Sequence, residues 1–118
     1  FKFVAWQDLP QLVAKADINL MPLESTVFHE CKSENKWMEA ALVNVPTIAS
    51  WNNELATVIK DGVDGFLCKN SEEWTNKLQQ LVKNENLRKQ IAHDAHERVI
   101  KEYMTNDVES EVFKILFN

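Results

Sequence analysis

Short apolar segments alternate with amphipathic ones along most of this chain, and this alternation limits the folds that it can adopt. The apolar segments, each a candidate for a buried strand, are residues 1–6, 18–21, 46–50 and 65–68. The segments between them have the spacing and capping residues of helices, and they are residues 9–16, 33–42 and 53–59. Strands that alternate with helices predict an α/β fold with a Rossmann-like parallel sheet flanked by helices.

Two longer helices are expected after the last strand. Ser71 is the expected N-cap of the first, whose apolar residues recur at helical spacing. Asn84 or Asn86 is expected to open the second, which ends near Tyr103. A further helix is expected to end at Phe117. With these elements the chain, residues 1–118, is interpreted as a single partial domain.

The composition excludes several classes of protein. The chain has 118 residues, is 45% hydrophobic and carries a net charge of −5, which does not fit general nucleic-acid binding. It has no apolar run near the roughly 20 residues of a membrane span. Its two cysteines show neither disulfide nor metal-binding spacing, which indicates a reduced, cytoplasmic protein. No carboxylate pair with metal-ligand spacing stands out, so neither a metal nor a cofactor is predicted.

The loop and helix start near residues 28–39 carry the strongest chemical signal. Lys32, Ser33 and Lys36 place two cations and a hydroxyl where a helix begins, and Glu39 follows about one turn later. Helix N-termini attract phosphate through free N–H groups and a positive dipole end. A carboxylate further along can accept hydrogen bonds from ribose hydroxyls. The grouping suggests a nucleotide-diphosphate site, although exposed lysines and an N-cap serine also occur without function.

The expected sheet supports the same location, because ligands of open parallel sheets bind beyond the carboxyl ends of the strands. Trp51 follows such an end and could cover a base or simply pack. His29 in the candidate loop is a weak catalytic signal, whereas His93 and His96 are expected to be solvated.

An ordered set of motifs covers nearly the whole chain: ADINLMPLE (16–24), F-x-x-x-K-S-x-x-K-W-x-E (28–39), VPTIAS (45–50), VIKDGVDGFLC (58–68), EEW (72–74) and LR (87–88). This set resembles the nucleotide-sugar-binding C-terminal domain of two-domain GT-B glycosyltransferases, specifically the retaining group called group 1 or family 4. The resemblance implies transfer of a hexosyl or related sugar from a nucleotide donor, with retention, to a glycan, lipid or small-molecule acceptor. It also implies a place in polysaccharide biosynthesis.

The resemblance gives the candidate residues specific roles. Glu39 would hold the ribose hydroxyls, Lys32 and Ser33 would contact the phosphates or the sugar, and Lys36 is a weaker phosphate candidate. The departing diphosphate would be stabilised by positive groups rather than by a tightly held metal. The nucleotide sugar would be a substrate, not a cofactor, and no catalytic residue is assigned.

Three departures from the family pattern support an alternative interpretation. Cys31 stands where the family has its first glutamate, Asn52 and Asn53 replace a Gly-Gly turn, and Thr57 replaces a following glutamate. A non-catalytic α/β domain that binds a partner or acts as a scaffold, with a degenerate donor site, is therefore the alternative. A dehydrogenase is disfavoured because the chain has no G-x-G-x-x-G motif.

The resemblance also implies missing parts. The chain begins inside a strand-like segment, so we expect a fragment that lacks the acceptor-binding N-terminal domain and the first strands of its own domain. Such a fragment is expected to be inactive alone and could form a dimer through an exposed sheet edge. The expected location is the cytoplasm, with a peripheral position on the inner face of the membrane as the alternative for the full-length protein.

Overall fold

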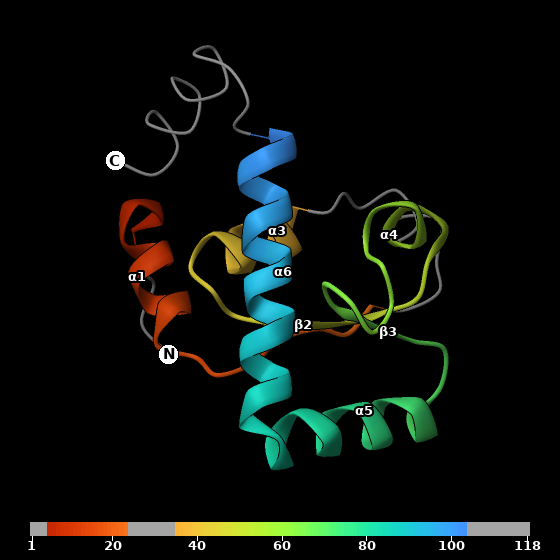
Figure 1. Ribbon diagram of the computed structural model, residues 1–118. Helices are drawn as coiled ribbons and strands as arrows, with labels where there is room; N and C mark the ends of the chain where they lie inside the picture. The colour runs from red at the N-terminus through yellow and green to blue at the C-terminus, as the bar shows by residue number, and fades with distance from the viewer. Residues whose placement is uncertain (1–4, 24–34, 104–118) are drawn as a thin grey trace.

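The computed structural model describes residues 5–23 and 35–103 of the chain (Figure 1). In chain order, the elements are η1 (Trp6–Asp8), α1 (Leu9–Ala14), β1 (Asn19–Met21), α3 (Asn35–Leu42), β2 (Thr47–Ser50), α4 (Asn53–Val58), β3 (Phe66–Cys68), α5 (Ser71–Lys83) and α6 (Glu85–Tyr103). The strands therefore alternate with helices as the sequence pattern predicts.

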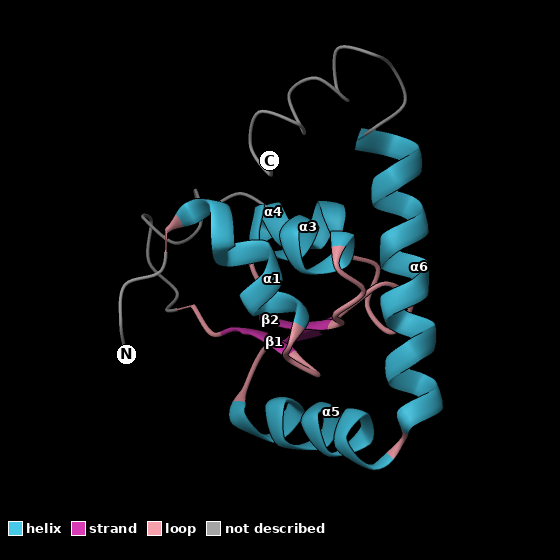
Figure 2. Cartoon of the chain, turned by 90° about the vertical axis from the view of Figure 1, so that its left-hand side faces the viewer, coloured by secondary structure: helices cyan, strands magenta, loops and turns pink. Residues whose placement is uncertain are grey.

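The three strands form one parallel sheet in the order β1-β2-β3. Figure 2 shows α3 and α4 on one face of this sheet and α5 on the other, while α6 runs past both layers. This arrangement confirms the predicted α/β fold with a parallel sheet flanked by helices. In such a sheet the carboxyl ends of all strands meet at one edge, which positions the loops that follow them.

The sheet has a core on each face because neighbouring residues of a strand point to opposite sides. Toward α3 and α4, the buried side chains include Met21, Ala49 and Leu67, which pack with Trp37, Leu55 and Val99. Toward α5, they include Ile48, Phe66 and Cys68, which pack with Leu81 and Ile91. Helix α6 contributes to both cores and so joins the two layers.

Asparagine side chains and one left-handed asparagine define several helix ends. Asn44 has a φ of 60°, and the N–H groups of Asn44 and Val45 donate to the carbonyls of Ala41 and Ala40 at the end of α3. This is the hydrogen-bond pattern of a Schellman motif, which ends α3 with Asn44 in the left-handed conformation. At the start of α5, Asn70 accepts a hydrogen bond from the Glu73 N–H.

Some predicted elements are wrong. Ser71 is the first residue of α5 rather than its N-cap, because the preceding Asn70 accepts the hydrogen bond from the first turn. Trp6 lies in a 3₁₀ turn rather than in a strand, since the Asp8 N–H donates to the Ala5 carbonyl at 2.9 Å. Residues 1–4 of the predicted first strand and the helix predicted to end at Phe117 lie outside the described residues.

Candidate functional site

Hydrogen bonds tie the three strands together at their carboxyl edge. The backbone N–H of Leu23, just after β1, donates to the Ser50 hydroxyl at the end of β2, over 2.9 Å. The N–H of Trp51 donates to the carbonyl of Cys68 at the end of β3, over 2.8 Å. These two hydrogen bonds hold the carboxyl ends of β1, β2 and β3 together.

Helix α3 presents two predicted site residues on the same face. Lys36 lies in its first turn and is exposed, and Glu39 lies one turn further along and is half-buried. Residues three apart on a helix are neighbours on its surface. The structure therefore brings Lys36 and Glu39 together, as the sequence analysis predicts.

The electrostatic environment of Glu39 is unusual for a helix carboxylate. Partial burial raises the pKa of its carboxyl group above the ordinary value, and the nearby positive charge of Lys36 offsets part of this effect. Burial without a fully compensating partner disfavours the charged form. Glu39 is thus a carboxylate that would gain from a hydrogen-bond donor or a positive charge brought by a ligand.

The opposite face of α3 is fixed in the core by Trp37. Its side chain is fully buried, and its indole N–H donates to the backbone carbonyl of Asp64 at 2.8 Å. Trp37 also contributes to the core between α3 and the sheet, together with Ala41. Because this face is rigidly packed, the outer face that carries Lys36 and Glu39 has a defined orientation.

The other predicted site residues have different outcomes. Lys32, Ser33 and His29 lie outside the described residues. Trp51 stands at the end of β2 with 40% of its surface exposed. His93 is exposed as predicted, but the prediction for His96 is wrong.

His96 is half-buried because α6 crosses the end of α3. Its Nδ1 lies 3.1 Å from the carbonyl of Ala41 in the last turn of that helix. The Ala41 carbonyl already accepts the Asn44 N–H, and its second lone pair is available for the contact with His96. Spacing along α6 alone does not reveal which of its polar residues meets the end of α3.

Within residues 5–23 and 35–103, no group of His, Cys, Asp and Glu side chains is arranged to hold a metal ion. No helix in the same part of the chain is both long and apolar enough to cross a membrane.

The fold described above is that of an α/β domain with a parallel sheet, a class in which ligands bind beyond the carboxyl ends of the strands. Residues 1–84 match the family model described as glycosyl transferases group 1. The chain belongs to this family. No match was found among curated proteins.

Solved structures of two proteins resemble this fold. The C-terminal domain of the glycosyl transferase group 1 family protein LpcC from Francisella tularensis has a TM-score of 0.71 at 22% identity, covering 87% of this chain and 52% of that one. Anabaena Alr3699/HepE in complex with UDP-glucose has a TM-score of 0.72 at 25% identity, covering 98% of this chain and 32% of that one. The same protein in complex with UDP and glucose has a TM-score of 0.73 at 22% identity, covering 97% and 30%.

These likenesses confirm the expected fold, that of the C-terminal domain of GT-B glycosyltransferases. This chain spans about half the length of the LpcC structure and about a third of the HepE chain.

Proposed function

We propose that this chain is the donor-binding part of a glycosyltransferase and that it binds a nucleoside diphosphate sugar. The observation that carries this proposal is the half-buried Glu39, which lies with Lys36 on the outer face of α3. The family supports the class of reaction. HepE, which has been solved with UDP-glucose, makes a uridine nucleotide the first donor to test.

The proposed roles follow from the chemistry of each side chain. The carboxylate of Glu39 would accept hydrogen bonds from the ribose hydroxyls, which compensate for its partial desolvation. Lys36 would contribute positive charge near the diphosphate, while Lys32 and Ser33 are proposed to contact the phosphates or the sugar. Positive groups at this position would stabilise the leaving diphosphate as the bond to the sugar breaks.

Several finer features of the proposed enzyme remain predictions. They include retention at the anomeric carbon, a glycan, lipid or small-molecule acceptor, a part in polysaccharide biosynthesis, and the need for a further acceptor-binding domain. The cytoplasmic location, with a peripheral position on the inner membrane face as the alternative, is also a prediction.

A dimer that forms through a free sheet edge is a prediction of the same kind. Among the described strands, β1 is the outer one on one side of the sheet, and a free edge can pair with a second copy. Light scattering that gives a monomer mass at millimolar concentration would remove this prediction.

The second candidate is a non-catalytic domain with a degenerate donor site. It is favoured by the Asn52 and Asn53 pair that replaces the family's Gly-Gly turn. Asn52 accepts a hydrogen bond from the Leu55 N–H at 2.7 Å and so caps α4. This capping role accounts for an asparagine at that position and leaves the choice between the two candidates to experiment.

Ligand-observed NMR with UDP, GDP, ADP and CMP tests the proposal. We expect one nucleoside diphosphate to bind with a dissociation constant on the order of 1 mM, or about −4 kcal/mol. Glu39→Gln should abolish this binding because an amide is a weaker acceptor for the ribose hydroxyls than a carboxylate. If no nucleoside diphosphate binds and Glu39→Gln changes nothing, the degenerate-site candidate is supported instead.

A further inference from the structure

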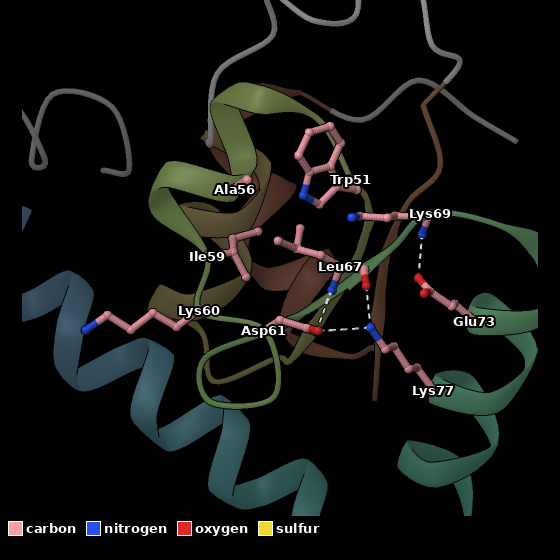
Figure 3. Close-up of a pocket in the computed structure, with 9 residues that line it drawn as sticks. All are labelled: Trp51, Ala56, Ile59, Lys60, Asp61, Leu67, Lys69, Glu73 and Lys77. Carbon is pink, nitrogen blue, oxygen red and sulfur yellow. Dashed lines mark hydrogen bonds and ion pairs between the residues drawn. The ribbon is translucent and has the colours of Figure 1, made fainter.

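A pocket lies at the outer edge of β3, between α4 and α5. Its volume is about 530 Å³, which is within the usual range for small-molecule sites. Figure 3 shows Trp51 at its upper end, Leu67 and Ile59 at its base, and charged side chains from α5 and the loop before β3 around it. Of the described donor-site candidates on α3, neither Glu39 nor Lys36 lines this pocket.

The base of the pocket is preformed. The N–H of Leu67 in β3 donates to the carboxylate of Asp61 at 3.0 Å, and the ammonium of Lys77 donates to the carbonyl of Leu67. Lys77 and Asp61 also form an ion pair at 3.1 Å. The N–H and the carbonyl of Leu67 are therefore both hydrogen-bonded to side chains. This opposes pairing of β3 with another strand at this position, so the space beside it is open to a small molecule.

The upper part of the pocket combines an aromatic ring with a cation. The ammonium of Lys69 lies 5.1 Å from the centre of the Trp51 ring, which is a weak contact at an exposed site. Because this contact is weak, a ligand could redirect the ammonium at small cost. The backbone N–H of Lys69 donates to one carboxylate oxygen of Glu73 at 2.7 Å.

The charges that face the pocket balance each other. The ammonium groups of Lys69 and Lys77 stand against the carboxylates of Asp61 and Glu73, while the Lys60 side chain extends away toward α6 (Figure 3). Two carboxylates would repel a phosphate dianion, and the nearby N–H groups of Leu67 and Lys69 are already bonded. The pocket thus disfavours a second nucleotide or a free phosphate.

We infer that this pocket binds a neutral sugar residue of a glycan. A pyranose ring presents an apolar C–H face, which matches the Trp51 ring and the apolar side chains of Leu67 and Ile59. Its hydroxyls both donate and accept hydrogen bonds, which matches the paired carboxylates and ammonium groups around the pocket. The identification of the ligand as part of an acceptor or product glycan rests on the proposed function.

Chemical shifts of the indole N–H groups test this inference on the 118-residue chain. The probes are the methyl glycosides of glucose, galactose, mannose and N-acetylglucosamine, with inorganic phosphate as the anionic control. We expect at least one glycoside to shift the Trp51 signal, assigned through Trp51→Phe, with a dissociation constant on the order of millimolar. The buried Trp37 indole, bonded to Asp64, should stay unchanged and serves as the internal control.

Matched lysine variants test the site itself. Lys69→Met should weaken glycoside binding about three- to tenfold through the loss of one hydrogen bond, whereas Lys83→Met, an exposed lysine outside the pocket, should have no effect. The inference is overturned if no glycoside shifts Trp51, if phosphate shifts it more than the glycosides do, or if both lysine variants behave alike. Nucleotide binding reports the donor site separately, so failure there leaves a positive glycoside result intact.

Discussion

Arg98 of α6 donates a hydrogen bond to the carboxylate of Asp64, 2.6 Å away, and this ion pair joins the long C-terminal helix to the loop before β3. The same guanidinium donates to the carbonyl of Val58 at the end of α4 and lies 5.4 Å from the centre of the Trp37 ring. The other Asp64 oxygen accepts the Lys60 N–H at 2.7 Å. The Arg98–Asp64 ion pair therefore links α6 to α4 and α3.

Removal of one partner of this pair should be costly. The side chains of Arg98 and Asp64 are 17% and 2% exposed, so Arg98→Ala leaves a buried carboxylate without its cation. We expect a loss of about 3 kcal/mol in the free energy of unfolding, measured by urea denaturation. Lys89→Ala is the control, since its pair with Glu85 is exposed and should contribute less than about 0.5 kcal/mol. Equal losses in the two variants would contradict the assigned role.

Gly65 should not tolerate a side chain. A Cβ at this position would lie 2.8 Å from Cγ2 of Ile59 and 3.3 Å from the carbonyl oxygen of Thr47. Gly65→Ala should therefore lower the free energy of unfolding by about 1–3 kcal/mol through overpacking.

Gly62 provides a comparison with a different cause. It has open space around it but a φ of 83°, so Gly62→Ala should cost about 1 kcal/mol through backbone strain alone. Gly62→Asn should recover part of that loss, because asparagine tolerates the left-handed region. If Gly65→Asn also recovered stability, overpacking would be the wrong explanation for Gly65.

The N-cap of α5 can be assigned by mutation. Because the side chain of Asn70 accepts the N–H of Glu73 at 2.9 Å, Asn70→Ala should lower the free energy of unfolding by about 1 kcal/mol. Ser71→Ala should change it by less than about 0.5 kcal/mol, since Ser71 lies inside the helix. If chemical denaturation shows a larger loss in the free energy of unfolding for Ser71→Ala than for Asn70→Ala, Ser71 is the N-cap and the assignment of Asn70 is wrong.

Glu39 should reduce stability at neutral pH. Burial raises the pKa of its carboxyl group in the folded chain, so the folded state holds this proton more tightly than the unfolded state does. The stability that results is fully present below the unfolded pKa and is lost as the pH rises through the folded pKa. At pH 7, Glu39→Gln should therefore be more stable than the original chain, by up to about 0.5 kcal/mol. Thermal unfolding at pH 7 and pH 3.5 measures this, and the difference should vanish at the lower pH. A variant that is less stable at pH 7 would contradict the role of burial.

The sheet and most helices could be predicted because their signals are local. The strand segments at residues 18–21, 46–50 and 65–68 are short and apolar, and each contains an observed strand. The stop at Asn44 could also be predicted, since asparagine accepts the left-handed conformation that ends α3. These features depend on only a few neighbouring residues.

Features that depend on residues far apart in the chain could not be predicted. The Arg98 and Asp64 pair, the contact of His96 with the end of α3, and the pocket between Trp51 and Lys77 all join different elements. Asn70 and Ser71 are adjacent and both are common N-cap residues, so the sequence alone does not show which of them caps α5. The adjacency of Lys36 and Glu39 could be predicted because both lie on one face of α3.

Isothermal titration of the chain with UDP-glucose, beside Glu39→Gln and the matched control Glu97→Gln, tests the donor-site proposal most directly. Glu97 is an exposed glutamate on α6, so its change should leave binding intact. The account predicts millimolar binding to the original chain and to Glu97→Gln, with no detectable heat for Glu39→Gln. Equal binding by all three proteins would contradict the assignment of Glu39 to the donor site.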